Sequence, residues 1–512
     1  MENNLNRLND LLILELNSEE LSGGRIGIER EGLRVSKNKL SDTLHPKILG
    51  SKLTNKFITT DFAETQLELI TPPIASKKNL IDFLEELHFF VHREIEDGIW
   101  PFSMPPFIEK ESDIKIADYG SSNSGLFKKI YRRGLSHRYG RFMQSISGLH
   151  LNYSFSDSLI QSILEQCSLS DDINSRSDIH LKTLRNIQKN NWLLLYFFGC
   201  SPFVSKNFSN DKLDLLSHKG SYYLPDATSL RMSELGYQNQ NQSKLHVSFN
   251  TLEEYCDDLL KLTETLSNEY DRIDLFRDGK YQQLNRNCLQ IEAEYYASCR
   301  PKSDLSIKGR PINILKNNGI NYIELRSLDI NPFSNVGIEA KTIDFLEVFF
   351  IYNCLSECTY LSSKCTEELR RNDLEVSKNG RSKFTKLLKN KSTISLYDEG
   401  SRILDGMSEI SKVLGHEESF LEYFKSMLRD PSKTLSGRFA LKAFEDNIEI
   451  EEFGYSLSRT NKDHFRKLNP KMQNFTEVIQ SEVKRSIEEE ERIQKETQLP
   501  FDKYLEEYYV SA

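Results

Sequence analysis

The sequence predicts an α+β fold in which a curved, mainly antiparallel sheet surrounds a polar site. Segments with helical periodicity and segments with two-residue alternation both occur along the chain, but they do not follow one another in strict turn. The alternating segments carry too much charge on their polar faces for a parallel sheet that helices bury on both sides. An antiparallel sheet with one face turned toward a polar site agrees with both observations.

Five segments have apolar residues at the spacing of a helix, three to four positions apart. They are 80–95, 181–198, 252–266, 342–358 and 477–498. The last of them is charged on nearly all sides, which predicts a solvated surface helix.

Five shorter segments alternate between polar and apolar residues, as a strand with one polar face does. They are 27–35 (GIEREGLRV), 65–71 (TQLELIT), 148–155 (GLHLNYSF), 289–296 (LQIEAEYY) and 322–330 (YIELRSLDI). Side chains two positions apart share a face of a strand. Four of these segments therefore present ionisable side chains on one face: Glu29 with Glu31, Glu68 beside Gln66, His150 with Asn152, and Glu324 with Arg326.

Carboxylates gathered on one sheet face repel one another by roughly several kcal/mol, and burial drives them to take up protons. Divalent cations remove this penalty. Mg²⁺ prefers oxygen ligands and commonly bridges protein carboxylates to the phosphates of a nucleotide. One imidazole among such ligands, here His150, is compatible with Mg²⁺ or Mn²⁺ and does not require zinc. The pattern therefore predicts a site for Mg²⁺ and a nucleotide.

Each of these signals also has a simpler structural interpretation when it is taken alone. A strand with the pattern Glu-x-Glu is more often the solvated face of an edge strand, and a lone histidine such as His150 is more often a hydrogen-bonded core residue. Asp61 followed by Glu64 has the spacing of a helix capping box, which predicts the start of a helix. Only the coincidence of the signals on several alternating segments favours a metal site.

The common nucleotide-binding motifs are absent from the sequence. It contains neither the Walker pattern Gly-x-x-x-x-Gly-Lys-Ser/Thr nor Gly-x-Gly-x-x-Gly after a strand, so ATP would be held through metal and arginine. The basic stretch 128–141 (KKIYRRGLSHRYGR), which includes Arg132, is open to two interpretations. It is either a solvated basic surface or an anion-binding segment.

Composition narrows the class of protein. The 512 residues carry a net charge of -9, which opposes non-specific attraction to nucleic acid or to an anionic membrane. The N-terminus lacks the basic head of a secretory signal, and no apolar stretch is long enough to span a bilayer. The eight cysteines form no Cys-x-x-Cys pair, as expected for reduced thiols. We therefore expect a cytoplasmic protein that acts on small molecules.

Five stretches resemble a known family when they are taken together. They are 27–35, 57–72 (FITTDFAETQLELITP), 139–155 (YGRFMQSISGLHLNYSF), 222–237 (YYLPDATSLRMSELGY) and 322–334 (YIELRSLDINPFS). Their order and spacing are similar to those of the glutamate-cysteine ligases of the proteobacterial type, strongly over residues 20–350 and more weakly beyond. The resemblance implies a glutamine-synthetase-like core, a sheet that forms a funnel surrounded by helices. It also implies one domain over 1–512 whose C-terminal part, 351–512, is helical.

The resemblance implies a role for individual residues. The metal ligands would be Glu29, Glu31, Asp61, Glu68, His150 and Glu324, holding two or three Mg²⁺ ions, with Mn²⁺ as a substitute. Arg326 would contact the transferred phosphate, so that Arg326 and Glu324 form the catalytic pair, and Arg132 is a further candidate for anion binding. The cysteine substrate would lie among Arg231, Tyr237, Tyr296, Phe62 and Gln144. Asp61 enters this set from the resemblance alone, against its interpretation as a helix cap.

The implied reaction joins L-glutamate to L-cysteine with ATP, through a γ-glutamyl phosphate, as the first step of glutathione biosynthesis. A related carboxylate-amine ligase with another amine, or a phosphotransferase of the guanidino-kinase type, would suit the same sheet. A non-catalytic relative that binds metal or nucleotide is a third alternative. The expected partners are the three small substrates, without nucleic acid or membrane, and the expected state is a monomer or weak oligomer.

Overall fold

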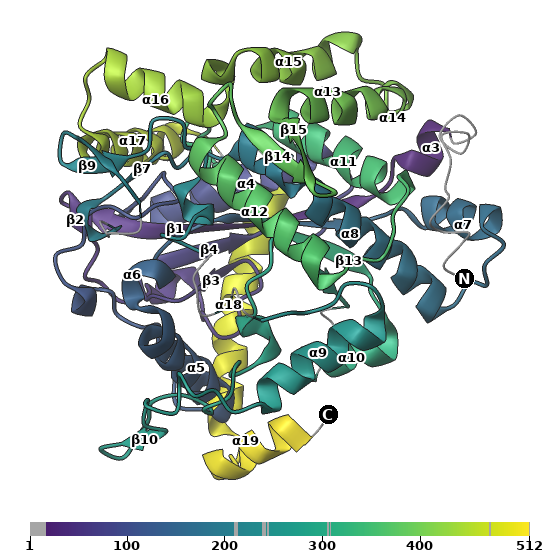
Figure 1. Cartoon of the computed structure of the whole chain (residues 1–512). Helices are drawn as coiled ribbons and strands as arrows, with labels where there is room; N and C mark the ends of the chain where they lie inside the picture. Colours follow the sequence, from purple (N-terminus) through teal and green to yellow (C-terminus); the bar gives the residue numbers. More distant parts are fainter. Residues whose placement is uncertain are drawn as a thin grey trace.

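An eight-stranded antiparallel sheet runs through the middle of the computed structural model (Figure 1). Its main path follows the order β12-β13-β6-β1-β4-β3, while β2 and β5 pair with β1. The strands are β1 (Arg25–Ser36), β2 (Lys39–Leu40), β3 (Ile58–Thr60), β4 (Gln66–Ile70), β5 (Gly98–Ile99), β6 (Leu149–Ser154), β12 (Cys299–Lys302) and β13 (Tyr322–Leu328). All pairs in this sheet are antiparallel, which confirms the predicted sheet type.

The structure describes residues 17–208, 213–237, 242, 245–304, 307, 309–469 and 473–510. The leading segment 1–16, in which the sequence predicts no secretory signal, lies outside the described residues. Among the helices of the described part, none is long and apolar enough to cross a membrane.

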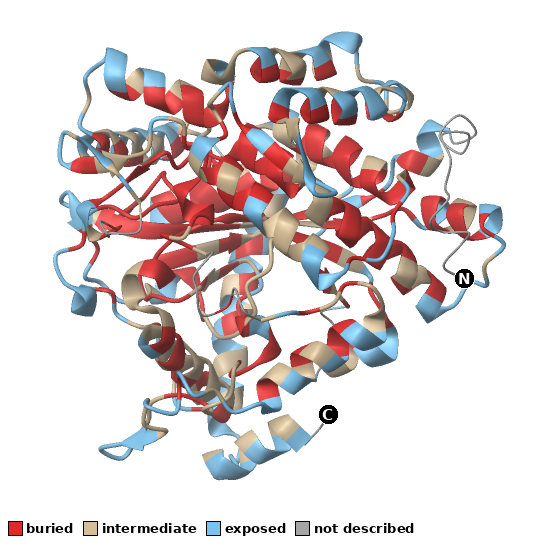
Figure 2. Cartoon of the chain, in the orientation of Figure 1, coloured by how far each residue is buried: buried red, intermediate tan, exposed pale blue. Residues whose placement is uncertain are grey.

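Long helices cover the apolar face of the sheet. They are α4 (Lys77–Glu94), α8 (Ile173–Phe198) and α11 (Ala340–Leu355), and Figure 2 shows this layer as mostly buried. Helix α12 (Ser363–Asn379) packs against α8 and is less buried. Ile28, Leu151 and Leu325 point into this layer and are fully buried. Helix α11 is apolar on nearly all sides because it lies inside the helical layer, next to α4 and α8.

The polar face of the sheet is bordered by α5 (Asn123–Tyr139) and the short α6 (Arg141–Gln144), which leads into β6. Helix α5 begins at a Ser122 cap, whose side chain accepts the Gly125 N–H, and it ends at Gly140 with φ 82°. The left-handed backbone at Gly140 turns the chain sharply, so that α6 and Gln144 come back toward the sheet.

The remaining elements surround this core. The other helices are α3 (Ser18–Leu21), α7 (Asp157–Gln166), α9 (Leu252–Glu264), α10 (Pro311–Asn318), α13 (Leu396–Gly406), α14 (Ser408–Val413), α15 (Glu418–Arg429), α16 (Leu435–Glu445), α17 (Ile450–Lys467), α18 (Gln473–Lys495) and α19 (Phe501–Val510). The smaller strands are β7 (Phe203–Val204), β8 (Leu216–His218), β9 (Ser221–Tyr223), β10 (Phe276–Arg277), β11 (Lys280–Tyr281), β14 (Lys386–Lys389) and β15 (Ser392–Ser395).

All five predicted helices and four of the five predicted strands are confirmed. The prediction of a strand at 289–296 is wrong, because this segment is irregular apart from a single 3-10 turn at Glu292–Glu294. Its alternating polar side chains bind nearby backbone groups in place of a neighbouring strand. Glu294 Oε2 accepts the Gln290 N–H at 2.6 Å, and Gln290 Oε1 accepts the Leu284 N–H at 3.0 Å.

Two local expectations need correction. Asp61 and Glu64 do not start a helix but lie in the turn between β3 and β4, where the Asp61 N–H donates to the Gln66 carbonyl. Glu64 instead accepts the Asp118 N–H at 2.7 Å, so it is not available for a capping box. Helix α18, predicted as solvated on all sides, buries Ile479 (1% exposed) in a small core cluster beside α4.

Candidate active site

The pairing register of the sheet brings the predicted ligands to one face. Glu29 on β1 lies opposite His150 on β6, and Glu31 lies opposite Glu68 on β4. On the other side of β6, Glu324 of β13 lies opposite Asn152. Residues directly opposite in adjacent strands point to the same face, and Asn152 shares a face with His150. The alternation argument is therefore confirmed for all four strands.

His150 lies at the centre of these carboxylates. Its Nδ1 is 3.4 Å from Glu29 Oε2 and 4.0 Å from Glu324 Oε1, and its Nε2 is 3.6 Å from Glu31 Oε1. One ligand atom each from Glu29, Glu68 and His150 lie within 4.8 Å of one another, which is a separation that one metal ion could bridge. We call Glu29, Glu31, Asp61, Glu68, His150 and Glu324 the acidic cluster.

The negative charge of the acidic cluster is not fully compensated on the β1–β4 side. Burial, and then the charges of Glu29, Asp61 and Glu31, raise the pKa of Glu68 well above its usual value. Burial also raises the pKa of Glu31, although His150 opposes the shift, and Asp61 adds to it. These shifts place Asp61 electrostatically within the cluster although it lies in a turn.

The β13 side of the cluster is compensated by cations. Burial opposes ionisation of Glu324, but Lys302 and then Arg326 hold its pKa well below the usual value. Lys302 Nζ lies 3.2 Å from Glu324 Oε2, and Arg326 Nη1 lies 3.1 Å from Oε1. Burial likewise opposes ionisation of Glu29, but its hydrogen bond with His150 lowers the pKa.

The donor set fits hard divalent cations. The cluster offers five carboxylates and one imidazole, and two of the carboxylates, Glu31 and Glu68, have raised pKa values because burial and neighbouring carboxylates outweigh the nearby positive charges. A bound cation would add the positive charge that favours their ionised forms. The zinc alternative is not favoured, because Zn²⁺ sites typically draw on cysteine and histidine and the described residues near this cluster include only one such ligand, His150.

The basic stretch 128–141 forms most of α5 and the first residue of α6, and it is more than a solvated surface. Arg132 stacks on the Tyr119 ring at 4.6 Å and donates a hydrogen bond to the Asp61 carbonyl. Lys128 lies over the same ring at 5.2 Å, and burial lowers its pKa to about 8. Both cations lie at the Asp61 and Glu68 side of the cluster, as an anion-binding role requires, whereas Arg138 is engaged in a buried ion pair with Glu294.

A small cavity lined by two tyrosines adjoins Arg326. Its lining residues are Arg231, Met232, Tyr237, Tyr296, Ala297, Ser298 and Arg326, and we call it the tyrosine pocket. The rings of Tyr237 and Tyr296 lie 5.2 Å apart, and Gln144 Nε2 donates to the Tyr296 hydroxyl at 2.6 Å.

Arg231 supports both the pocket and the strand that carries Arg326. Its guanidinium lies 5.0 Å from the centre of the Tyr237 ring, and its Nη2 donates to the Arg326 carbonyl at 2.8 Å. It also forms an ion pair of 3.5 Å with the buried Asp329. Two predicted substrate residues, Phe62 and Gln144, do not line this cavity. Gln144 reaches it through the Tyr296 hydroxyl, whereas Phe62 is 1% exposed in the main core.

Comparisons with known proteins agree with this geometry. A family model described as glutamate-cysteine ligase matches residues 10–376. The chain belongs to the glutamate-cysteine ligase family. The glutamate-cysteine ligase of Alcanivorax borkumensis is 37% identical over 510 residues, which is 96% of each chain. That of Sodalis glossinidius is 44% identical over 366 residues, or 70% of this chain and 69% of the relative.

Solved structures share the fold. The glutamate-cysteine ligase of Francisella tularensis, solved in complex with AMP, superposes with a TM-score of 0.90 at 34% identity and covers 96% of this chain and 98% of its own. A bifunctional glutathione synthetase from Pasteurella multocida shares the fold with a TM-score of 0.71 at 24% identity, over 90% of this chain and 57% of its own. These findings confirm the resemblance, the α+β fold and the predicted class of enzyme, an ATP-dependent ligase of the glutamate-cysteine type.

Sequence reasoning missed some residues of this ligase site. Lys302 contacts Glu324 from β12, a strand that no alternation pattern indicated. Asn152 donates to Glu29 Oε1 at 2.8 Å, and its shared face with His150 could have indicated this contact.

All eight cysteines are unbridged, as predicted.

Proposed function

We propose that this chain joins the γ-carboxylate of L-glutamate to the amine of L-cysteine at the expense of ATP, giving γ-glutamylcysteine, ADP and phosphate. The observation that carries this proposal is the acidic cluster, converging on one sheet face directly beside Arg326 and the tyrosine pocket. Family membership supports the substrate pair, and the AMP in the Francisella relative supports an adenine nucleotide.

The acidic cluster would hold two or three Mg²⁺ ions, with Mn²⁺ as a substitute. When bound, such ions neutralise charge on the phosphates of ATP, so that an anionic carboxylate can approach the terminal phosphorus. His150 would contribute the nitrogen ligand at the centre of the cluster, and Asn152 fixes the Glu29 carboxylate through its amide. Glu31 and Glu68, whose ionised forms are disfavoured by burial and by neighbouring carboxylates, would gain most from a bound cation.

Arg326 would stabilise the charge that develops on the transferred phosphoryl group. Its guanidinium is held at 3.1 Å by Glu324, which fixes the direction of the remaining N–H donors before the substrate binds. Glu324 and neighbouring carboxylates keep Arg326 fully charged, because they raise its pKa against the effect of burial. Arg132 and Lys128 would hold other phosphate oxygens at the opposite side of the cluster.

The tyrosine pocket would receive the amine substrate. Attack on the acyl phosphate requires the cysteine amine to lie next to the phosphorylated carboxylate, and this pocket shares Arg326 with the phosphate site. Tyr237 and Tyr296 would contact the substrate, with Gln144 fixing the Tyr296 hydroxyl. Arg231 would attract the substrate carboxylate, and Phe62 would support the pocket from the core.

We further infer one catalytic domain over the whole chain. The main hydrophobic cluster includes residues from Leu21 to Phe465, so the N-terminal sheet and the C-terminal helices share a core. A cytoplasmic location and a monomeric or weakly oligomeric state stay predictions from the sequence.

A product assay tests this function. Purified protein is incubated with ATP, Mg²⁺, L-glutamate and L-cysteine, and γ-glutamylcysteine is sought by mass spectrometry while ADP is followed. We expect ADP only when all components are present, and we expect Glu31→Gln to abolish turnover whereas Glu109→Gln, an exposed control, does not. Faster product formation with another amino acid would instead favour a related carboxylate-amine ligase. Phosphoryl transfer to a guanidino compound would favour a phosphotransferase of the guanidino-kinase type.

A further inference from the structure

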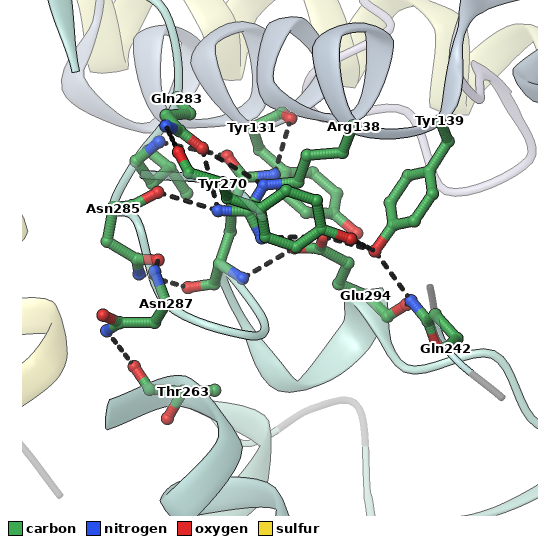
Figure 3. Close-up of polar contacts among 12 residues, drawn as sticks. Tyr131, Arg138, Tyr139, Gln242, Thr263, Tyr270, Gln283, Asn285, Asn287 and Glu294 are labelled. Atoms are coloured by element: carbon green, nitrogen blue, oxygen red, sulfur yellow. Dashed lines mark hydrogen bonds and ion pairs between the residues drawn. The ribbon is translucent and has the colours of Figure 1, made fainter. Parts of the chain in front are cut away.

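A buried polar network joins α5 to the irregular segment 283–296 (Figure 3). At its centre, Arg138 Nη1 and Glu294 Oε1 form an ion pair of 3.0 Å, and both side chains have 0% exposure. Arg138 also donates to Gln283 Oε1 at 2.9 Å and to the Asn285 carbonyl at 2.8 Å. Its guanidinium lies 4.1 Å from the centre of the Tyr270 ring. The ion pair at its centre is removed from solvent, whereas Tyr139 and Asn285 are half-buried, and the network contributes no residue to the acidic cluster.

The same network reaches Tyr296 of the tyrosine pocket through Tyr139 and Gln242. The Tyr139 hydroxyl donates to Glu294 Oε1 at 2.9 Å, and Gln242 Nε2 donates to the Tyr139 hydroxyl at 2.9 Å and to the Glu294 carbonyl at 2.7 Å. Gln242 Oε1 in turn accepts the backbone N–H of Tyr296 at 2.7 Å. The Tyr139 and Tyr296 rings meet edge to face at 5.8 Å.

These contacts replace the ladder of a sheet. Because 289–296 is not a strand, the backbone that carries Tyr296 lies outside the sheet ladders formed by the described residues. Glu294 fixes this backbone with both carboxylate oxygens. One accepts the Tyr139 hydroxyl of α5, and the other accepts the Gln290 N–H at 2.6 Å. Burial, and then the Glu294 charge, raise the pKa of Tyr139, so its hydroxyl stays protonated and continues to donate.

The second contact to Tyr296 comes from the same part of the chain. Gln144, which binds the Tyr296 hydroxyl at 2.6 Å, lies in α6, only one sharp turn beyond Tyr139 at the end of α5. The α5–α6 segment therefore holds Tyr296 twice, at the backbone through Glu294 and Gln242 and at the hydroxyl through Gln144. A displacement of either contact would move the pocket wall and leave the acidic cluster in place.

We propose that Glu294, held by Arg138 and Tyr139, is a positioning residue that fixes Tyr296 and thereby sets the affinity of the tyrosine pocket for its amino-acid amine. This inference rests on the proposed function, in which Tyr296 contacts the amine substrate. Glu294 itself touches no substrate. Its role is selective, because the groups it fixes belong to the amine pocket and not to the site of phosphoryl transfer.

Tyr139→Phe tests the inference without leaving a buried charge unpaired, since it removes the hydroxyl and keeps the ring. The variant removes the hydrogen bond that Tyr139 donates to Glu294 and the one that it accepts from Gln242. We expect the KM for cysteine to rise about three- to tenfold, while the KM values for glutamate and ATP stay unchanged. Gln242→Met is the second variant, because it removes the acceptor of the Tyr296 N–H and keeps a side chain of similar length. We again expect a higher KM for cysteine with unchanged KM values for glutamate and ATP. Tyr281→Phe is the matched control, since its hydroxyl binds Asp502 of α19, away from the pocket.

A second readout separates the two half-reactions. Hydroxylamine traps the acyl phosphate as a hydroxamate, with release of phosphate, and such a small amine does not need the tyrosine pocket. The rate of hydroxamate formation should be the same in Tyr139→Phe and the wild type. If all KM values change together, if the hydroxamate rate falls in parallel, or if no parameter changes in either variant, the inference is wrong. A wild-type protein that forms no γ-glutamylcysteine would instead contradict the proposed function.

Discussion

Replacing Glu68 with glutamine should stabilise the metal-free protein and weaken its response to Mg²⁺. Ligand atoms of Glu68 and Glu29 lie within 4.8 Å of one another, so two ionised carboxylates repel by about 3 kcal/mol at an effective dielectric constant of about 20. Burial, together with this repulsion, raises the pKa of Glu68 well above its usual value. We therefore expect Glu68→Gln to raise the free energy of unfolding in EDTA by about 1 to 3 kcal/mol at pH 7.5.

The pH dependence follows from the direction of the pKa shifts. Glu68 and Glu31 have raised pKa values in the folded state, so the folded protein binds more protons than the unfolded chain above the ordinary value of 4.5. Their contribution to the stability of the metal-free wild type should therefore increase as pH falls from 7.5 toward that value, whereas buried histidines such as His88 and His92, whose pKa values are lowered by burial, destabilise the fold over the same range. Glu29 and Glu324 have lowered pKa values and contribute stability that is lost only as pH falls below 4.5. The stability that Glu68→Gln gains over the wild type should therefore shrink as pH falls toward 4.5, because the histidine contribution is the same in both proteins.

Urea unfolding followed by circular dichroism measures both effects. In the wild type, Mg²⁺ at 100 times its Kd should add about 2.7 kcal/mol, and the variant should gain less at the same concentration. Glu109→Gln, at an exposed carboxylate, serves as the control and should change neither value. If Glu68→Gln lowers the stability of the metal-free protein at pH 7.5, the carboxylates are not held in repulsion and the reasoning is refuted.

Three further predictions concern activity. Removal of divalent ions with EDTA should reduce ADP release to background, and Mg²⁺ or Mn²⁺ should restore it; turnover that persists in EDTA would exclude a metal role for the acidic cluster. Arg326→Gln should lower kcat by about 10² to 10³-fold, because it removes a hydrogen-bond donor to the charge that develops in the transition state. Arg326→Lys should recover only part of the lost kcat, because lysine lacks the planar, forked guanidinium. A kcat near that of the wild type would show that Arg326 does not act on the phosphoryl group. Tyr296→Phe removes the acceptor of the Gln144 hydrogen bond and should raise the KM for cysteine about tenfold, equivalent to about 1.4 kcal/mol, in steady-state assays; an unchanged KM would place the amine elsewhere.

Alternation in the sequence was sufficient to predict which face each ligand occupies. The period of a strand is two, so Glu29 and Glu31 must share a face wherever the strand lies. Which residue stands opposite which could not be predicted in this way, because the pairing of Glu31 with Glu68 depends on a register set across many intervening residues. Asp61 was predicted as a metal ligand from the resemblance to the family alone. Its spacing to Glu64 predicted a helix cap instead, but the segment forms a turn after β3.

The irregular segment 289–296 shows where the pattern misleads. Gln290, Glu292 and Glu294 alternate with apolar neighbours as in a strand, but Gln290 and Glu294 bind nearby backbone and α5. Glu292 binds Arg310 and the first turn of α10. Local sequence does not contain the partner Arg138, which lies more than a hundred positions earlier, so neither the buried ion pair nor its link to Tyr296 could be predicted. Contacts of this kind are set by tertiary packing.

Anomalous diffraction from crystals grown with Mn²⁺ and an ATP analogue tests the central claim most directly. The account predicts manganese peaks about 2.1 Å from carboxylate oxygens of Glu29 and Glu68 and from a nitrogen of His150, with further peaks toward Glu31 or Glu324. Manganese bound only at other positions, with these side chains free of metal while the crystals retain activity, would contradict it.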